Sequence, residues 1–210
     1  MDKVIIIDYK MGNLYSIANA CEKVGLEVEI SSDPSKIKSA KALILPGVGA
    51  YPLAVKHLNE NRLASYITDF VKTGKKVFGI CLGMQLLMEQ SDEFGLNKGL
   101  GIITGEVLRF PENSDPTKTR HIPQITWNNV QIEIPNHPLF KGIRNNEYFY
   151  FVHSNYVEPK QKENILCTTE YAGFTYASAV VKENVYGIQF HPEKSGIQGL
   201  RIFENFKYLI

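Results

Sequence analysis

Apolar runs alternate with amphipathic stretches through the first half of the chain. Continuous apolar runs at 4–7, 42–45 and 77–80 predict strands that are buried on both faces. Segment 26–30 alternates apolar and acidic residues, which is typical of a half-exposed strand. This alternation of strands with helices predicts an α/β fold, with a mostly parallel sheet and helices on both faces. The helices predicted from apolar residues at helical spacing cover 14–24, 54–58 and 63–71.

The second half of the chain has a different pattern, in which short apolar segments are separated by Pro, Asn and Gly. Segment 185–190 returns to a buried strand, and 197–208 predicts a final helix. Segment 111–119 is polar, contains two prolines and predicts a mobile surface loop. With no internal repeat, the pattern predicts one domain over residues 1–210, an α/β core with an antiparallel insertion. The short strands are predicted at 106–110, 130–134, 148–152, 165–169 and 174–181.

The most informative stretch is 76–87, KVFGICLGMQLL, which places one cysteine between a predicted strand and a predicted helix. Gly79 and Gly83 flank Cys81 in the order G-x-C-x-G, which is the pattern of a nucleophile elbow. The glycines permit a strained turn, and the positive end of the helix favours a thiolate. The alternative interpretation is a buried structural cysteine, which is common for unpaired thiols.

Three loops follow predicted parallel strands and are therefore expected at the same edge of the sheet. Asp8 follows the first strand, the loop 46–49 follows the third, and Cys81 follows the fourth. The sequence predicts that these three segments converge on one crevice.

Charge and cysteine content narrow the possible functions. The chain has 23 Lys and Arg against 22 Asp and Glu, so its net charge of +1 predicts neither a nucleic-acid nor a membrane partner. The N-terminal apolar segment is too short for a signal peptide, and no stretch is long enough for a membrane span, which predicts a cytoplasmic protein. Three widely spaced cysteines predict neither disulfides nor a metal site.

The run YGIQFHPEKSG provides a candidate base. His191 and Glu193 lie two residues apart after a predicted strand, so an extended backbone directs both side chains to the same side. Pro192 between them disfavours a helical conformation at His191. A carboxylate beside an imidazole stabilises the imidazolium, which is what a base next to a thiol requires. A surface turn is the alternative, but together with Cys81 the pair predicts a Cys-His-Glu triad.

Segments 79–85 (GICLGMQ) and 189–195 (QFHPEKS) closely resemble the class I (triad) glutamine amidotransferases. The resemblance implies a flavodoxin-like α/β fold with a smaller antiparallel sheet, and no cofactor or metal. Within this family the chain is most similar to the glutaminase subunits of imidazole glycerol phosphate synthases. That likeness covers essentially the whole chain and rests on segments 8–14, 45–49, 150–154 and 199–206.

The resemblance implies that Cys81 attacks the side-chain amide carbon of L-glutamine. His191, oriented by Glu193, would protonate the departing ammonia, and water would hydrolyse the thioester to glutamate. The oxyanion would be held by the Leu82 N–H and by a second N–H from the glycine loop Gly47, Val48 and Gly49, whose peptide is thought to turn when a partner binds.

The resemblance also implies a substrate pocket and a partner. The substrate's amino-acid end would be held by Gly49, Gln85, Val152, His153 and Ser154. For Gln85, the alternative is the solvent face of its helix. The partner would be a (β/α)₈-barrel cyclase that uses the ammonia to make imidazole glycerol phosphate and AICAR in histidine biosynthesis. It would contact Asn13, Trp127 and Lys194, although Trp127 could instead belong to the core.

Two departures from the family pattern leave the partner open. The usual Pro-His-Met-Gly-Trp-Asn reads PQITWN here, with Gln124 and Thr126 replacing the His and the Gly, and Lys10 replaces a usual glycine. Both segments are expected near the partner. Alternatives are therefore a paralogous glutaminase that supplies a sugar amidotransferase in surface-polysaccharide synthesis, a cysteine peptidase or deglycase, and a non-enzymatic binding module.

Overall fold

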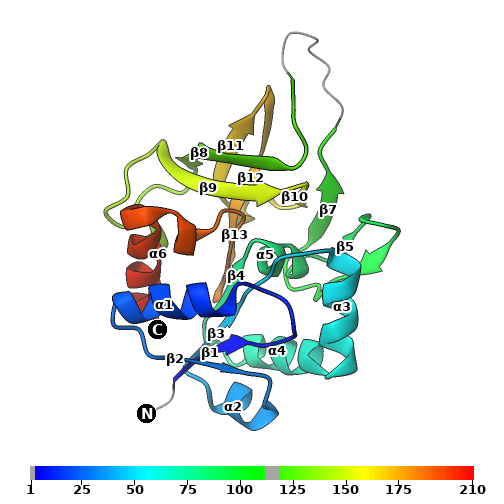
Figure 1. The fold of residues 1–210 in the computed structure, drawn as a ribbon, viewed down its shortest axis with the longest axis vertical. Coiled ribbons are helices and arrows are strands. Elements are labelled where there is room, and N and C mark those ends of the chain that lie inside the picture. Colours follow the sequence, from blue (N-terminus) through cyan, green and yellow to red (C-terminus); the bar gives the residue numbers. More distant parts are fainter. Residues whose placement is uncertain (1–2, 112–118) are drawn as a thin grey trace.

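The structure is a computed structural model that describes residues 3–111 and 119–210, so most of the predicted loop 111–119 lies outside the described residues. Four strands of the first half and one strand near the C-terminus form a parallel sheet in the order β2-β1-β3-β4-β13 (Figure 1). The sheet was predicted from the buried apolar runs. Its strands are β1 (Val4–Ile7), β2 (Val28–Ser31), β3 (Ala42–Leu45), β4 (Val77–Ile80) and β13 (Val185–Ile188).

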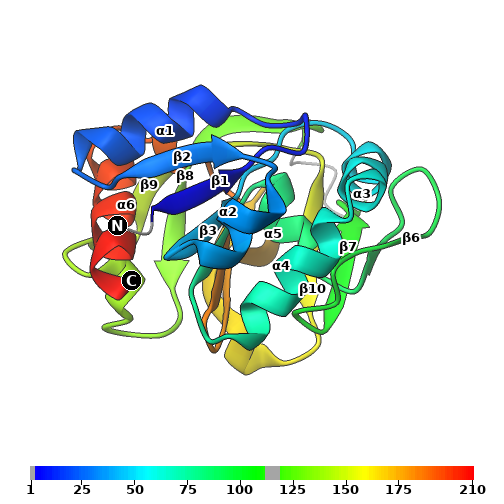
Figure 2. The same cartoon turned by 90° about the horizontal axis from the view of Figure 1, so that it is seen from below.

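Helices cover both faces of the parallel sheet (Figure 2). Successive side chains of β1 point to opposite faces: Ile6 packs in the apolar cluster of α1 and α6, and Ile7 packs in the cluster of α3 and α4. The first face carries α1 (Leu14–Lys23) and α6 (Gly196–Leu209). The other carries α2 (Pro34–Ser39), α3 (Tyr51–Glu60), α4 (Leu63–Lys72) and the short α5 (Leu82–Leu86).

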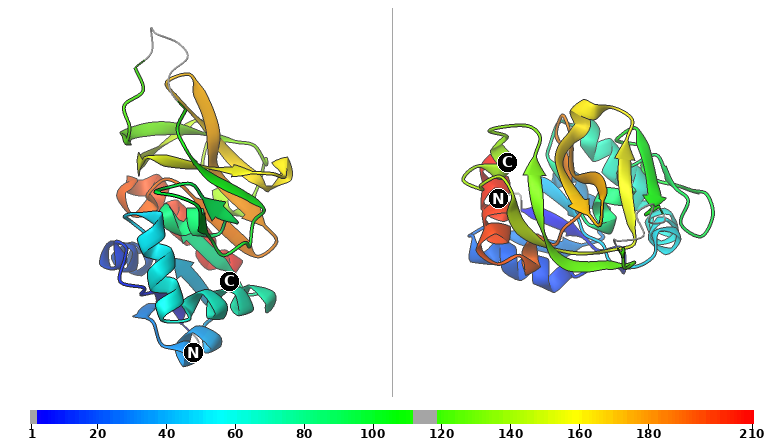
Figure 3. Two further views of the ribbon diagram at one scale, coloured as in Figure 1. Left: turned by 90° about the vertical axis from the view of Figure 1, so that its right-hand side faces the viewer. Right: turned by 90° about the horizontal axis from the view of Figure 1, so that it is seen from above.

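Beyond β13 the sheet continues in mostly antiparallel strands that rise away from both termini (Figure 3). Strand β12 (Phe174–Lys182) pairs with β13 and joins the two parts. From β12 one branch runs through β10 (Asn155–Pro159), β7 (Gly105–Arg109), β5 (Gln90–Ser91) and β6 (Asn97–Lys98). The other runs through β11 (Ile165–Tyr171), β8 (Gln124–Ile132) and β9 (Glu147–His153). Short 3₁₀ helices are η1 (Pro138–Phe140), η2 (Lys162–Asn164) and η3 (Pro192–Lys194).

The predicted start of one strand was wrong. The sequence predicted a strand from residue 130, whereas β8 begins at Gln124. The middle of this strand is exposed or half-buried and has no continuous buried face. Its apolar pattern is therefore interrupted by polar residues, namely Thr126, Asn128 and Asn129.

Two of the three cysteines are ordinary core residues. Cys21 and Cys167 are buried and unpaired. Burial raises the pKa of the Cys21 thiol to about 12 and raises that of Cys167 well above its usual value. Both thiols are therefore protonated and unreactive near neutral pH.

The described residues contain no helix that is both long and apolar enough to cross a lipid bilayer.

Candidate active site

Adjacent parallel strands bring Cys81 and His191 to the same edge of the sheet. Strands β4 and β13 pair with Ile80 opposite Ile188, and the Cys81 N–H donates to the Ile188 carbonyl at 2.8 Å. Cys81 follows the carboxyl end of β4 and His191 follows that of β13. Two segments more than a hundred residues apart in sequence thus meet at the position where open α/β sheets bind ligands.

The predicted elbow is present at Cys81. Its φ of 54° and ψ of −111° are strained values for a residue with a side chain. A Cβ on Gly83 would overlap the carbonyl oxygen of Leu45, and one on Gly79 would lie 2.7 Å from the Gly83 oxygen. The flanking glycines are therefore required, because the turn packs directly against backbone.

His191 and Glu193 form a buried pair. Nδ1 of His191 lies 2.8 Å from Oε1 of Glu193, and both side chains are almost inaccessible to solvent. Asn13 also donates from Nδ2 to this Oε1, at 3.3 Å. The predicted extended geometry was wrong: only His191 is extended, and η3 turns the chain so that Glu193 folds back towards the ring. The turn begins at Pro192, whose fixed φ suits the first position of a helix.

The charges around His191 favour its protonated form. Burial lowers its pKa, but the neighbouring negative charge of Cys81, together with Glu193, outweighs burial and raises the pKa above the usual value. The second ring nitrogen, Nε2, is buried without a hydrogen-bond partner among the described residues. It is the nitrogen free to exchange a proton with a reacting group, since Nδ1 is occupied by Glu193.

Gln189, which the sequence analysis did not single out, contacts the thiol directly. Its Nε2 donates to Sγ of Cys81 at 3.5 Å, and Sγ lies 3.8 Å from the Val152 carbonyl. Nε2 of Gln85 donates to Oε1 of Gln189 at 3.1 Å, which fixes the orientation of the Gln189 amide. The signal was its position two residues before His191, because alternate residues of an extended segment share one side.

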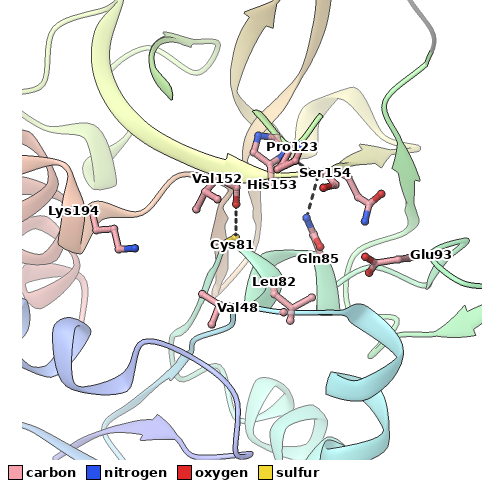
Figure 4. Close-up of a pocket in the computed structure, with 12 residues that line it drawn as sticks. Val48, Cys81, Leu82, Gln85, Glu93, Pro123, Val152, His153, Ser154 and Lys194 are labelled. Atoms are coloured by element: carbon pink, nitrogen blue, oxygen red, sulfur yellow. Dashed lines mark hydrogen bonds between the residues drawn. The ribbon is translucent and has the colours of Figure 1, made fainter. Parts of the chain in front are cut away.

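A cavity of about 450 Å³ opens beside the thiol (Figure 4). Its lining includes most of the residues predicted to bind substrate, and it also includes Glu93, which was not predicted. Glu93 precedes the exposed tip between β5 and β6, where sequence periodicity gives no signal. The residues that line the cavity are Val48, Gly49, Cys81, Leu82, Gln85, Glu93, Pro123, Val152, His153, Ser154, Asn155 and Lys194.

The glycine loop is supported from below by Tyr9. The Tyr9 hydroxyl donates to the Pro46 carbonyl at 2.6 Å, and a Cβ on Gly47 would lie 2.6 Å from that hydroxyl oxygen. Gly47 thus lies beneath the cavity, whereas Val48 and Gly49 line it. The predicted convergence of the segment after β1 with the glycine loop is made through Tyr9. Asp8 itself is not among the cavity-lining residues, and its carboxylate accepts the N–H of Lys10 at 2.9 Å in a local turn.

Gln85 is buried, which contradicts the alternative of a solvent-facing residue. Its Nε2 donates to the Asn155 carbonyl at 3.1 Å as well as to Gln189. His153 is also buried, and its ring is bonded to the Asn155 carbonyl and to the Tyr176 hydroxyl, so its imidazole is held within the protein.

Three residues predicted to contact a partner surround the outer side of the site. Asn13 bonds to Glu193, and Lys194 lines the mouth of the cavity with its ammonium 5.7 Å from the Tyr150 ring. Trp127 is 50% exposed and packs edge-on against the same ring, so it is not the core residue of the alternative interpretation.

The departures from the family pattern have different structural settings. Gln124 is fully buried, because strand alternation directs it inward while Ile125 and Trp127 of the same segment point outward. Lys10 has a φ of 67°, a conformation that glycine adopts without strain. No group of three or more His, Cys, Asp or Glu in the described ranges is arranged to hold a metal ion.

Comparisons with known proteins agree with this geometry. A curated relative from Methanosarcina mazei, the imidazole glycerol phosphate synthase subunit HisH, is 47% identical over 208 residues, covering 98% of each chain. The protein of the same name from Sulfurimonas denitrificans is 44% identical, covering 97% of this chain and 96% of the relative. The solved structure of PurLQS from Thermotoga maritima has the same fold, with a TM-score of 0.72 at 20% identity over 100% of this chain and 99% of that one. The family model for class-I glutamine amidotransferases matches residues 5–209, and the chain therefore belongs to that family.

Proposed function

We propose that this chain is the glutaminase subunit of an imidazole glycerol phosphate synthase. It would hydrolyse L-glutamine to glutamate and ammonia, and the ammonia would pass to a cyclase subunit in the cytoplasm. The observation that carries the glutaminase assignment is the placement of Cys81 and His191 on adjacent strands beside one cavity, with Glu193 bonded to His191. The near full-length relatives that bear this subunit's name support the pathway.

In the proposed reaction the Cys81 sulfur attacks the side-chain amide carbon of glutamine. The carbonyl π electrons move to oxygen and form a tetrahedral oxyanion. When this collapses, the C–N bond breaks, and the His191 imidazolium donates its Nε2 proton so that nitrogen leaves as ammonia. A water then attacks the thioester with His191 as base, which releases glutamate and restores the thiol. Glu193 stabilises the charged ring in both steps.

The oxyanion has a donor at the start of α5. Leu82 is the first residue of this helix, and the first N–H groups of a helix have no partner within it. We propose that the Leu82 N–H and one N–H of the loop formed by Gly47, Val48 and Gly49 hold the oxyanion. Removal of one such donor typically costs on the order of 10²-fold in rate.

One wall of the cavity carries a charge that suits the α-ammonium of the substrate. We propose that Glu93 pairs with the α-ammonium, because its carboxylate is partly buried on the cavity wall and held by the Tyr51 N–H at 2.8 Å. Backbone at Gly49 and at 152–154, with the helix residue Gln85, would hold the rest of glutamine.

A partner subunit is part of the proposal because free ammonia in neutral water is protonated and is no longer a nucleophile. We propose a (β/α)₈-barrel cyclase that docks over Asn13, Trp127 and Lys194. Lys194 lines the cavity, Asn13 bonds to Glu193, and Trp127 packs against the Tyr150 ring. The exposed Ile125 and Trp127 provide the kind of apolar surface that a partner covers.

The other functions left open by the sequence have less support. A paralogous subunit that supplies a sugar amidotransferase was left open by Gln124, Thr126 and Lys10, but the near full-length relatives bear the name of the imidazole glycerol phosphate synthase subunit. A peptidase or deglycase has no need of the buried amides Gln85 and Gln189 beside the thiol.

The proposal is tested by assaying glutamate release with a barrel cyclase and its ribonucleotide ligand present. We expect glutamine hydrolysis that requires the partner and is abolished in a Cys81→Ala protein. Undiminished hydrolysis by the Cys81→Ala protein would exclude the mechanism. Turnover of peptides or glyoxal adducts without a partner would instead support a peptidase or deglycase.

A further inference from the structure

Buried hydrogen-bonding groups connect strand β8 with the cavity. Gln124 Oε1 lies 3.0 Å from the Tyr176 hydroxyl, which lies 3.2 Å from Nε2 of His153. Nδ1 of His153 lies 2.8 Å from the Asn155 carbonyl, to which Gln85 also donates at 3.1 Å. All five residues are buried, so water does not compete for these bonds.

The direction of the bonds follows from counting hydrogens. The Asn155 carbonyl can only accept, so Nδ1 of His153 must carry a hydrogen. Burial lowers the pKa of His153 to about 4, so its ring is neutral near pH 7 and has only this one hydrogen. Nε2 is therefore an acceptor, and the Tyr176 hydroxyl must donate its hydrogen to His153.

This assignment determines how the Gln124 amide is turned. A hydroxyl has one hydrogen, so Tyr176 cannot donate to His153 and to Gln124 at once. With its oxygen towards Tyr176, Gln124 also leaves Nε2 buried and without a hydrogen-bond partner. Turning the amide end for end places Nε2 against the Tyr176 oxygen, in the same shape, so Tyr176 keeps its one hydrogen for His153. The amide oxygen then takes the buried position at which Nε2 had no partner.

We propose that Gln124 and Tyr176 are positioning residues that donate in sequence, Gln124 to Tyr176 and Tyr176 to His153, and thereby hold the turn at 153–155 that forms one wall of the glutamine pocket. The His153 N–H closes this turn by bonding to Asn155, two residues further on. The proposal deepens the proposed glutaminase function and rests on it for its kinetic consequences. Its hydrogen-bond pattern is a property of the free chain.

The first test is long-range ¹H–¹⁵N NMR of the chain without partner or substrate. We expect His153, identified by loss of its signals in a His153→Gln protein, to be neutral with its hydrogen on Nδ1 between pH 6 and 8. A hydrogen on Nε2, or on both nitrogens, would overturn the proposed direction. This measurement does not depend on whether the chain hydrolyses glutamine.

The second test is glutaminase kinetics with the barrel cyclase present. Tyr176→Phe and Gln124→Met each remove one donor with little change in volume. We expect each to raise the KM for glutamine about 5- to 10-fold and to change kcat less than about 2-fold, because a lost buried hydrogen bond costs about 1 kcal/mol. Tyr156→Phe is the matched control, since Tyr156 packs against the same Phe110 ring but takes no part in these bonds.

An unchanged KM in both variants would exclude the positioning role. An unchanged KM in Gln124→Met alone would show that Gln124 does not help to position the turn at 153–155. If the wild-type chain hydrolysed no glutamine with its cyclase, the proposed function would fail, and the NMR result would still decide the hydrogen-bond direction.

Discussion

At the scale of single residues, the surroundings of Cys81 differ sharply from those of the other two thiols. All three belong to the same apolar cluster, and burial raises the pKa of Cys21 and of Cys167. Cys81 alone of the three lies on a strained turn, with the Gln189 amide against its sulfur. Cys81 itself is only 6% exposed, so the groups around its sulfur, and not its exposure to solvent, distinguish it as the reactive thiol.

Removal of the amide at Gln189 should slow the chemistry of the thiol. Its N–H stabilises negative charge on Sγ of Cys81, and hydrogen bonds to charged groups contribute about 1.5–3 kcal/mol. We expect Gln189→Leu to lower the rate of Cys81 alkylation by iodoacetamide at pH 7 at least about 10-fold. Gln90→Leu, which removes a side-chain hydrogen bond to Glu106 outside the cavity lining, is the control and should react as the wild type does. Equal rates in the two variants would contradict a role for Gln189.

Substitutions at Gly83 and Gly74 compare the cost of a steric clash with the cost of backbone strain. A Cβ on Gly83 meets the Leu45 carbonyl, whereas Gly74 has open space but a φ of 79°. We expect Gly83→Ala to lower the free energy of unfolding by about 3 kcal/mol or more, and Gly74→Ala by about 1–2 kcal/mol. Urea denaturation of both proteins measures the difference. A smaller loss in Gly83→Ala than in Gly74→Ala would mean that the elbow tolerates displacement.

At the scale of elements, the parallel half was predictable because its strands are buried on both faces. The runs 4–7, 42–45 and 77–80 match β1, β3 and β4 in their bounds. Helix α2 (Pro34–Ser39) was missed although it has a clear start signal, since Asp33 caps the Ser35 N–H. A helix of this length has too few turns to show periodicity.

Residues that act through a turn or a cross-strand neighbour were harder to predict. The sequence indicated Cys81, His191 and Glu193 from local patterns, but not Glu93 or Gln189. Glu93 reaches the cavity only because the short β5–β6 pair turns back towards the Tyr51 N–H of α3. Such an approach depends on tertiary packing, which periodicity does not report.

The turn after β9 should make stability depend on pH through His153. Its pKa falls to about 4 in the folded chain, whereas an unfolded histidine titrates near 6.5. Between these values the unfolded state binds more protons, so stability is full above about pH 6.5 and decreases as the pH falls towards 4.

The measurement is urea denaturation of wild type and His153→Gln at pH 7, 6 and 5. From pH 6 to 5 we expect the wild type to lose about 1.2 kcal/mol more than the variant. The exposed His121 is the control position, and His121→Gln should keep the wild-type dependence. Parallel losses in wild type and His153→Gln would show that His153 is already protonated in the folded state.

At the scale of the whole molecule, the cavity mouth and the exposed aromatic surface lie on the same side. Trp127 pairs with Tyr150 of β9 across the sheet, and the Lys194 ammonium lies 5.7 Å from the centre of the Tyr150 ring. The site is therefore bordered by a surface that a second subunit can cover, and product released there would enter the interface before it reached bulk solvent.

Trp127 is expected to contribute strongly to partner binding. Truncation of a central interface tryptophan typically costs 2 kcal/mol or more, so Trp127→Ala should weaken binding of the barrel cyclase about 30-fold in titration calorimetry. Iodoacetamide alkylation of Cys81 should stay at the wild-type rate. Tyr208→Ala, which alters a still more exposed aromatic residue in α6, is the control. Equal affinities of the two variants would place the interface elsewhere.

Strand β13 has a consequence for how the molecule opens. It pairs with β4 on one side and with β12 on the other, and its four residues are all buried. No local fluctuation can release its amide hydrogens without separating the two parts of the sheet. In hydrogen–deuterium exchange we expect these amides to be among the slowest and to exchange with the free energy of global unfolding. Strand β13, which precedes His191, would then stay paired with β4 and β12 for as long as the protein is folded.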